Sequence, residues 1–315
     1  MKDILVVTIY GDIHAAAFQH CIHKHCKVKC RLLEVDSLGL RDGVAWKIGP
    51  QSAPQAVLID TEGNPINVED IGLVWWRRYY LSPRLGDISL SPEDLELVGR
   101  DTGASILGSF LTTYTGVWVN DPISTTNAEN KLVQLSAARK AGFRIPDTLV
   151  SNIPSEVRSF VDRHNGQVIV KPVRGTILKT YFTRKITPEH LGDDASIRLS
   201  PAMYQEYIPG NTHLRVHCFG NNQYTAKLDS PDLDWRENLD IPLAEADTSI
   251  DLREKIRTTL DILKLKMGVI DIKIDNEGEA VWLEVNAQGQ FLFVEGLADM
   301  QLMDRFVDFI ISEIE

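Results

Sequence analysis

The first third of the chain alternates short apolar runs with longer amphipathic stretches. The runs Ile4–Val7 and Leu73–Tyr80 are rich in β-branched or aromatic residues, which predicts strands. The stretch from Pro92 to Tyr114 is long enough for a helix and has a proline in its first turn, where proline is tolerated. Strands that alternate with helices predict an α/β domain. The Asp121–Pro122 pair interrupts this pattern, so we expect the first domain to span residues 1–120.

Two pairs of apolar runs in the second half of the chain are each separated by a short polar turn that contains glycine. The pairs are Leu214–Phe219 with Gln223–Lys227, and Val269–Lys273 with Ala280–Asn286. A short glycine-containing turn between two strand-like runs favours an antiparallel hairpin. The sequence therefore predicts two hairpins, which extend the sheet structure into the second half of the chain.

Four other segments complete the predicted elements. A helix is expected over Asn127–Ala141, ended by a glycine. Ser155 is expected to cap the next helix. Residues 230–246 are polar and acidic and contain two prolines, so we expect a surface loop. The last helix is expected over about Met300–Ile311, with one apolar face.

Composition and charge narrow the classes of protein. The 315 residues are 43% hydrophobic and 24% charged, as in ordinary globular proteins, which excludes a disordered chain. The formal net charge of -11 disfavours nucleic acid as a partner, because its phosphates repel an acidic surface. No apolar run approaches the roughly 20 residues that span a bilayer, and four cysteines do not form a disulfide framework. We therefore expect a cytoplasmic protein without membrane contact.

The strongest candidate chemistry lies in the second predicted hairpin. Glu284 and Asn286 are two residues apart on one strand, so their side chains share a face, and the preceding strand can bring Asp271 beside them. Three converging oxygen ligands suit a hard cation such as Mg²⁺. A solvated polar face on an ordinary hairpin would show the same pattern, so both interpretations stay open on this pattern alone.

A second candidate is Lys171, which ends the apolar run Val168–Val170 and precedes Gly175 and Thr176. A lysine at this place can bind a phosphate as a point charge, and a glycine lets backbone amides approach an anion. The Walker spacing is absent, and lysines often end strands without binding a ligand. Lys131, on the preceding helix, gives a still weaker signal because helical lysines are normally solvated.

A third candidate is the segment Tyr204–Gly210. Glu206 could accept a hydrogen bond from the amino group of adenine, while backbone atoms of Tyr207 and Ile208 supply further bonds. Gln205 lies on the same strand. The alternative is an edge strand that is closed by a proline.

Two other clusters have structural explanations. If the stretch His20–Cys30 were helical throughout, Cys26 and Cys30 would share a face and could bind zinc. However, no C-x-x-C pair is present, and Cys30 is expected to begin a strand. An aromatic run is expected in the core rather than as a platform for stacking bases: Trp75, Trp76, Tyr79 and Tyr80.

Taken in order, the candidate segments resemble the ATP-grasp ligases. The resemblance covers the chain from about Asn120 onward and rests on Asn130–Lys131, Val170–Pro172, Gln205–Ile208, Arg215, Asp271 and Leu283–Asn286. Several segments are similar to the ATP-grasp maturases that make microviridins and other graspetides, which are related to the ribosomal-protein glutamate ligases. These segments are Val74–Arg78, Asp121–Pro122, Asn130–Leu132, Asp234–Arg236 and Glu284–Phe291.

This resemblance implies a fold and a set of roles. The fold would hold a nucleotide between two α+β subdomains, residues 121–200 and 201–315, and would carry an N-terminal α/β domain. Arg215 would face the transferred phosphate and act in catalysis together with Lys171. Lys131 and Lys171 would hold the nucleotide phosphates. The segment Gln205, Glu206, Tyr207 and Ile208 would bind the adenine. Two Mg²⁺ ions would be held by Asp271, Glu284 and Asn286, with Glu284 bridging them.

The sequence departs from the family pattern at two positions. Many relatives have an acidic residue two positions before the arginine, where this chain has His213. Many graspetide enzymes have a proline after the E-V-N motif, where this chain has Ala287. The first departure leaves the role of His213 open. The second weakens the resemblance to the graspetide enzymes but does not affect the expected magnesium site.

The implied activity is the ATP-dependent activation of a peptide carboxylate through an acyl-phosphate. A hydroxyl or amine of the same peptide would then displace phosphate and form a lactone or lactam. The partner would be a precursor peptide with a leader and a core of acidic and hydroxyl residues, and two copies of the chain could form a homodimer. The alternatives are a ligase that adds an amino acid to a protein or small molecule, and a nucleotide-binding module without turnover.

Overall fold

The computed structural model describes residues 2–79, 82–174, 181–238 and 240–315. The chain forms two compact units, Met1–Pro122 with Gln301–Glu315, and Ile123–Met300. The division lies close to the Asp121–Pro122 pair that interrupts the sequence pattern. The chain therefore leaves the first unit after Pro122 and returns to it for its last helix. The division expected from the sequence instead placed this helix in the subdomain of residues 201–315.

A parallel sheet forms the centre of the first unit, in the strand order β2-β1-β6-β7. The run Ile4–Val7 is confirmed as part of β1, whereas the strand expected over Leu73–Tyr80 ends at Trp76 in β6. The sheet strands are β1 (Asp3–Thr8), β2 (Cys30–Glu34), β6 (Ile71–Trp76) and β7 (Val117–Val119). An antiparallel sheet adds β3 (Val44–Gly49), β4 (Ser52–Ile59) and β5 (Pro65–Asn67), with short 3-10 turns at Leu38–Leu40 and Val68–Asp70. The mixture of strands and helices confirms the α/β class.

Three long helices complete the first unit: α1 (Ile13–His25), α2 (Pro92–Thr113) and α10 (Leu302–Ser312). The helix expected from Pro92 is confirmed as α2, and the Ser91 side chain accepts a hydrogen bond from the backbone of Asp94 at its start. Side chains at i and i+4 share one face of a helix, which lets α10 present an apolar stripe to the core. This stripe explains why α10 packs in the first unit.

Aromatic side chains from three elements meet in the core of the first unit. The ring centroids of Phe18 and Trp75 are 5.1 Å apart, and that of Phe306 lies 5.4 Å from Phe18 and 4.6 Å from Trp75. Trp75 and Trp76 are buried, which confirms their expected place in the core. Tyr80, from the same aromatic run, lies outside the described residues.

The second unit contains two antiparallel sheets. The four-stranded sheet has the order β10-β9-β11-β8, and the five-stranded sheet has the order β14-β13-β12-β15-β16. The strands of the first sheet are β8 (Thr148–Ser151), β9 (Val168–Lys171), β10 (Arg184–Lys185) and β11 (Ala202–Glu206). Those of the second are β12 (Thr212–Phe219), β13 (Asn222–Asp229), β14 (Leu243–Ala246), β15 (Met267–Ile274) and β16 (Ala280–Asn286). Both predicted hairpins are confirmed, as β12–β13 and β15–β16.

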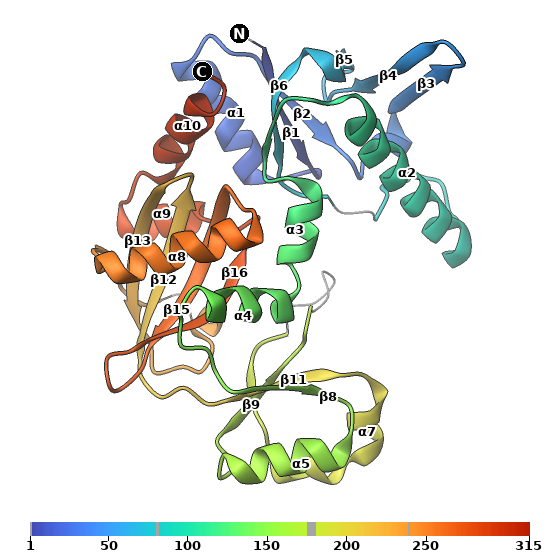
Figure 1. Ribbon diagram of the computed structural model, residues 1–315. Helices are drawn as coiled ribbons and strands as arrows, with labels where there is room; N and C mark the ends of the chain where they lie inside the picture. Colours follow the sequence, from blue (N-terminus) through green and yellow to red (C-terminus); the bar gives the residue numbers. More distant parts are fainter. Residues whose placement is uncertain (1, 80–81, 175–180, 239) are drawn as a thin grey trace. The chain divides into compact units, whose positions relative to one another are not determined.

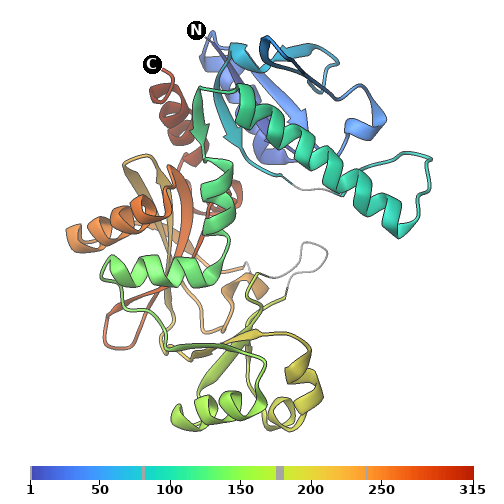
Figure 2. The ribbon, with the colours of Figure 1, turned by 45° about the vertical axis from the view of Figure 1, so that its right-hand side comes forward.

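Helices cover one face of each of these sheets. The helices α5 (Pro154–Arg163) and α7 (Asp194–Leu199) lie against the four-stranded sheet with the short α6 (Pro188–Gly192) (Figure 2). The helices α4 (Lys131–Lys140) and α8 (Ile250–Leu263) cover one face of the five-stranded sheet (Figure 1). The remaining helices are α3 (Pro122–Ala128) and α9 (Leu292–Ala298). Covering one face leaves the other face of the five-stranded sheet for polar side chains.

Three expectations about local structure are wrong in detail. The helix expected over Asn127–Ala141 is divided, because the Asn130 side chain accepts a hydrogen bond from the backbone of Leu132 and so caps a new helix, α4. Ser155 does not cap α5, which begins one residue earlier at Pro154. Residues 230–246 are not a simple surface loop, since they contain β14 and a 3-10 turn at Trp235–Glu237, whose tryptophan is buried.

In the part of the chain that the structure describes, no helix combines the length and the apolar character needed to cross a bilayer.

Candidate functional site

The polar face of the five-stranded sheet brings together the candidate metal ligands. The strand register places Arg215 opposite Asp271, and Asp271 opposite Glu284. Asn286 pairs with Val269, one row further along the same face. The opposite face, with Ile270 and its neighbours, belongs to the core beneath α4 and α8. Two carboxylates and an amide therefore line one side of the sheet, as the spacing of the hairpin predicts.

A bulge in β16 lies within this group. Asp271 pairs with Glu284, but the next residue, Ile272, pairs with Trp282, so Leu283 is an extra residue in the strand. A bulge of this kind bends the strand locally and changes the direction of a side chain. Here it keeps the Trp282 side chain in the core while Glu284 stays on the polar face.

Each of the two carboxylates is bound by a cation of the chain itself. The Nζ atom of Lys131 lies 2.8 Å from Oε2 of Glu284. A terminal nitrogen of Arg215, Nη1, donates to both carboxylate oxygens of Asp271, at 2.7 and 2.9 Å. Lys131 is the first residue of α4, where the helix dipole disfavours a positive charge. The Glu284 carboxylate offsets that effect.

Burial and neighbouring charges set the pKa values in this group. Although burial opposes it, the ammonium groups of Lys131 and Lys171 lower the pKa of Glu284 to about 2. Burial lowers the pKa of Lys171 to about 8, against the opposite effect of Glu284. Burial raises the pKa of Asp271, and the guanidinium of Arg215 limits that rise. Perturbed pKa values of several adjacent groups are typical of a functional site.

Arg215 is held firmly in place. Its guanidinium carbon lies 5.5 Å from the ring centroids of both Trp235 and Phe293, and these two rings stack on each other at 6.2 Å. Its Nη2 donates to the carbonyl of Gln290 at 3.2 Å. The side chain is only 9% exposed. Arg215 is therefore a buried partner of Asp271 rather than an open binding group.

The site contains a further cation, Arg236, to which the sequence analysis assigns no role. Its Nε and Nη2 atoms donate to the two carboxylate oxygens of Asp234, at 2.7 and 2.6 Å. The hydrogen bond to Asp234 raises the pKa of Arg236, and the charges of Glu284 and Asp271 act in the same direction. The only sequence signal for this residue was the resemblance of Asp234–Arg236 to the peptide maturases.

His213 also lies on the polar face, in the row before Arg215. Burial, aided by the charge of Lys273, lowers the pKa of His213 to about 4, so the imidazole is neutral at pH 7. Its buried Nε2 atom has no hydrogen-bond partner among the described residues. Burial next to Lys273 thus favours the uncharged form of His213.

The candidate adenine segment lies at the end of β11. Gln205 is buried and donates to Oγ1 of Thr148 at 2.9 Å. A terminal nitrogen of Arg144 lies 3.5 Å from Oε1 of Glu206. The backbone N–H of Tyr207 already donates to the carbonyl of Gln167, at 2.9 Å. The Tyr207 N–H is therefore already used, and only the Tyr207 carbonyl could hydrogen-bond to adenine.

The ring of Tyr207 is flanked by two lysines. The Nζ atoms of Lys185 and Lys273 lie 4.2 and 5.5 Å from the ring centroid. Ile208, the next residue along the chain, is buried. The Tyr207 ring thus has positive charge beside it.

Lys171 ends β9, where it pairs with Met203 of β11. Its charge interacts with Lys131, Glu284 and Arg236, which places it within the same group. The structure describes the chain as far as Arg174. Gly175 and Thr176, the proposed approach to an anion, lie outside the described residues.

The zinc alternative fails on local structure. Helix α1 ends at His25, and Cys30 begins β2, so Cys26 and Cys30 do not share a helical face. The ring of His23 instead accepts a hydrogen bond from the backbone of Cys30, at 3.3 Å. Over residues 2–79, 82–174, 181–238 and 240–315, no three His, Cys, Asp or Glu side chains are grouped as metal ligands. The set at the polar face has two carboxylates, and its third donor is the amide of Asn286.

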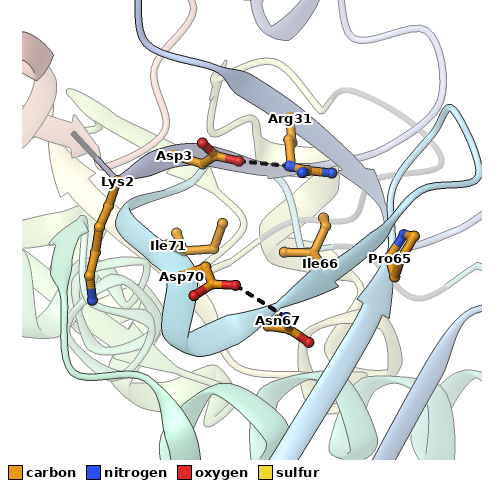
Figure 3. Close-up of a pocket in the computed structure, with 8 residues that line it drawn as sticks. All are labelled: Lys2, Asp3, Arg31, Pro65, Ile66, Asn67, Asp70 and Ile71. Carbon is orange, nitrogen blue, oxygen red and sulfur yellow. Dashed lines mark hydrogen bonds and ion pairs between the residues drawn. The ribbon is translucent and has the colours of Figure 1, made fainter.

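A separate pocket of about 450 Å³ lies in the first unit (Figure 3). It lies at the amino ends of β1 and β6, whereas ligands of open α/β sheets bind at the carboxyl ends of the strands. Its basic side chains are already bonded, Arg31 to Asp3 and Lys2 to the carbonyl of Glu69. Among the residues that the structure describes, the pocket therefore lacks the unpaired cations and paired carboxylates that would make it an alternative phosphate or metal site.

Comparison with known proteins identifies the fold. No family model matches the chain, and no curated protein matches it in sequence. The structure is similar to that of the macrocyclase MdnC of Microcystis aeruginosa MRC bound with precursor peptide MdnA, with a TM-score of 0.84, 22% identity and coverage of 97% of this chain and 98% of that one. The chain has the ATP-grasp fold.

Two other solved structures share this ATP-grasp fold. The RiPP-associated ATP-grasp ligase of Chryseobacterium gregarium, in complex with ADP and a leader and core peptide, has a TM-score of 0.84, 23% identity and coverage of 99% and 97%. The ATP-grasp ligase PsnB, complexed with minimal precursor, Mg and ADP, has a TM-score of 0.78, 20% identity and coverage of 99% and 97%. The ATP-grasp fold implied by the sequence resemblance is therefore confirmed.

Proposed function

We propose that this chain is an ATP-dependent ligase that forms ester or amide crosslinks in a ribosomally made precursor peptide. The observation that carries the proposal is the pairing of Asp271 with Glu284 on the polar face, each bound by a cation of the chain. Lys171 adds a half-buried ammonium group to the same site. Carboxylates for metal ions beside cations for phosphates are what phosphoryl transfer requires.

The nucleotide would lie between the charged group and the Tyr207 segment. Lys131 and Lys171 would hold its phosphates. The carboxylate of Glu206 would accept from the adenine amino group, and the Tyr207 carbonyl and the Ile208 backbone would contact the base beside the buried Gln205. The neighbours with bound nucleotide support this role: one holds ADP, and PsnB was solved with AMPPNP as well as with Mg and ADP.

The donors on the polar face fit magnesium. Asp271, Glu284 and Asn286 offer hard oxygen ligands, and both carboxylates already attract cations of the chain. We propose that they hold two Mg²⁺ ions, with Glu284 shared. Bound magnesium would neutralise charge on the phosphates and on the leaving group. Lys131 would then turn from Glu284 to the phosphate oxygens, while Arg215 stays paired with Asp271.

The proposed reaction has two steps. An oxygen of a peptide Asp or Glu carboxylate attacks the γ-phosphorus of ATP, the bond to ADP breaks, and an acyl-phosphate forms. A hydroxyl or amine of the same peptide then attacks the acyl carbon, and phosphate leaves with the proton of the nucleophile. Arg215 and Lys171 would stabilise the negative charge of the transferred phosphate. No covalent enzyme nucleophile is needed.

A peptide partner is supported by the named neighbours, since MdnC and PsnB were solved with precursor peptides. The runner-up is a ligase that adds an amino acid to a protein or small molecule. The third alternative is a binding module without turnover, which would not require both carboxylates. We also propose that the protein works in the cytoplasm, where ATP and precursor are available, and that a homodimer is its simplest assembly.

Mass spectrometry separates these functions. The full chain is incubated with ATP, Mg²⁺ and the peptide encoded in a neighbouring short reading frame that carries Thr or Ser with Asp or Glu. We expect the peptide to lose one water, about 18 Da, for each crosslink, with one ADP released. A mass gain equal to an added amino acid would support the runner-up. No mass change with any such peptide would contradict both ligase functions.

A further inference from the structure

The side chain of Gln134 joins helix α4 to strand β16. Its Nε2 atom donates to the carbonyl of Val285 at 2.8 Å, and its Oε1 atom accepts a hydrogen bond from the backbone N–H of the same residue at 2.9 Å. The Nε2 atom also donates to the carbonyl of Ala128, the last residue of α3. Gln134 is only 3% exposed. The two N–H groups of the amide therefore each have an acceptor, and the amide orientation is fixed.

These hydrogen bonds lie at the outer edge of the five-stranded sheet. β16 is the last strand in the sheet order, so its outer side faces no further strand in the part of the chain that the structure describes. The N–H of Trp282 is instead bound by the carbonyl of Arg144, at 3.0 Å. Further along the strand, the Gln134 amide binds both backbone groups of Val285. A side-chain amide thus satisfies backbone groups that a neighbouring strand would otherwise bind.

The bound residue, Val285, has a special place in β16. It lies between Glu284 and Asn286, two of the candidate metal ligands, and soon after the extra residue Leu283 of the bulge. A bulge interrupts the regular pairing of a strand, so the segment beyond it gains from a further constraint. The Gln134 amide supplies that constraint next to both ligands.

Lys131 lies on the same face of α4 as Gln134. The two residues are three positions apart, which makes their side chains neighbours on the helix surface. Lys131 reaches Glu284, and Gln134 reaches the next residue of β16, Val285. The Lys131–Glu284 pair is partly open to water, with side chains 21% and 25% exposed, so it holds the helix weakly. The buried amide is therefore the firmer link between α4 and β16.

We propose that Gln134 is a positioning residue that holds Lys131 in a fixed place relative to the metal-ligand strand β16. In the proposed function Lys131 turns from Glu284 to phosphate when magnesium binds, which breaks one of the two links. The Gln134 amide is uncharged and buried, so it stays bonded to Val285 in both states. The cation for the phosphates and the strand for the metal ions then keep one geometry. This inference rests on the proposed function and adds a residue that touches neither ligand.

A double-mutant cycle tests whether Gln134 acts through Lys131. The affinity of the full chain for ADP is measured by calorimetry in EDTA, so that neither metal nor turnover contributes. Gln134→Met keeps the length of the side chain but removes its hydrogen bonds, and we expect it to lower the affinity roughly tenfold, as should Lys131→Met. The double variant should bind ADP within about twofold of Lys131→Met alone, because the positioned cation is already absent. Independent effects would instead multiply to roughly 100-fold.

The metal ligands are tested separately, with Mn²⁺ as the probe. Electron paramagnetic resonance measures free Mn²⁺ while the full chain is titrated in the presence of ADP. Loss of a group that supports metal ligands weakens metal binding by roughly 10- to 100-fold, and we expect a loss in this range for Gln134→Met. Gln134→Asn keeps the amide on a side chain that is shorter by one methylene group, so its losses should lie between those of the wild-type protein and Gln134→Met.

The matched control is Gln223→Met. Gln223 donates to the carbonyl of Arg253 at 2.9 Å and so ties β13 to α8, on the same sheet but at no candidate ligand. This variant removes a hydrogen bond of the same kind. It should leave the affinities for ADP and for Mn²⁺ within about twofold of the wild-type values.

Three results would overturn the inference. They are fully multiplicative losses in the cycle, an unchanged affinity of Gln134→Met for ADP or Mn²⁺, and a failure of both Gln134 variants to fold, which would make the residue a support of the whole unit. Near-UV circular dichroism checks the fold, and Gln134→Asn takes the place of Gln134→Met in the cycle if the latter unfolds. A failure of the proposed function differs, because the wild-type protein would then give no ATP-dependent mass loss in the precursor peptide.

Discussion

The ammonium group of Lys131 lies 2.8 Å from a carboxylate oxygen of Glu284, and this pair joins the start of α4 to β16. Arg215 and Asp271 form an equivalent pair one strand away. In each pair a candidate phosphate-binding cation neutralises a candidate metal ligand. The chain thus keeps its own charges balanced on the polar face.

Glu284→Gln should remove activity without unfolding the protein. The amide has nearly the same shape but no charge, so we expect a loss of turnover of at least about 100-fold if Glu284 binds the metal ions. The loss of its pair with Lys131 should lower the free energy of unfolding by no more than about 1 kcal/mol, since both side chains keep some contact with water. Turnover with ATP and Mg²⁺, together with thermal unfolding, measures both effects.

Glu279→Gln is the matched control, because this glutamate is exposed on the turn of the same hairpin. It should leave turnover unchanged. Near-normal activity of Glu284→Gln would show that the metal assignment is wrong.

Lys171→Ala should weaken nucleotide binding more than peptide binding. The ammonium is proposed to contact only phosphate, so we expect the affinity for ADP to fall roughly 10- to 100-fold, as for a lost charge-assisted hydrogen bond. Calorimetric titrations with Mg²⁺-ADP and with the precursor peptide measure the two losses. Equal losses for both ligands would contradict the assignment, as would an unchanged affinity for ADP.

Nucleotide affinity should depend on pH through Lys171. Burial lowers the pKa of this lysine to about 8 in the free protein, and the protonated form is the one that attracts phosphate. The affinity for ADP should therefore be highest below pH 8 and should fall as the pH rises above 8. Lys171→Arg keeps its charge over this range, so its affinity should change much less between pH 7 and about pH 9.5. A wild-type profile that stays flat to pH 9.5 would exclude a role for the Lys171 charge.

Gly210→Ala should destabilise the connection between β11 and β12. Gly210 has φ +119°, and a Cβ atom there would meet the carbonyl of Ile274 and lie 3.2 Å from Cα of Asp275. Gly278 also has a positive φ, +86°, but nothing lies within 4 Å of its Cβ position. Gly278→Ala should therefore cost only the strain of the left-handed backbone, about 1–2 kcal/mol.

Chemical denaturation of the two variants compares these costs. The free energy of unfolding should fall further for Gly210→Ala than for Gly278→Ala, because a backbone clash adds to the strain. Equal losses would mean that the connection moves aside to accept the methyl group.

The sequence was sufficient to predict structure where two strand-like runs flank a short turn. Two apolar runs, 269–273 and 280–286, around a glycine-containing turn identified the hairpin, and the pairing of its strands places Asp271 and Glu284 on one face. The ion pair between Lys131 and Glu284 could not be predicted, because it depends on α4 beginning at Lys131. That point is fixed by the side chain of Asn130, which ends one helix and starts another.

The sequence was insufficient where a residue depends on distant contacts. Residues 230–246 show no periodic pattern, yet Trp235 is buried against Phe293, and Asp234 is bonded to Thr183. Both partners are remote along the chain, so Arg236 could not be placed from local spacing. Lys273 presents the same difficulty, because its burial beside Tyr207 follows from the approach of β10 and β11.

The return of α10 to the first unit has a consequence for synthesis on the ribosome. Phe306 completes an aromatic cluster whose other members, Phe18 and Trp75, are translated long before it. Unit Ile123–Met300 can fold as soon as it emerges, whereas the earlier residues keep an open apolar surface until α10 arrives. A truncated product that lacks residues 301–315 would keep Phe18 and Trp75 without their partner Phe306, so we expect it to aggregate more readily than the full chain.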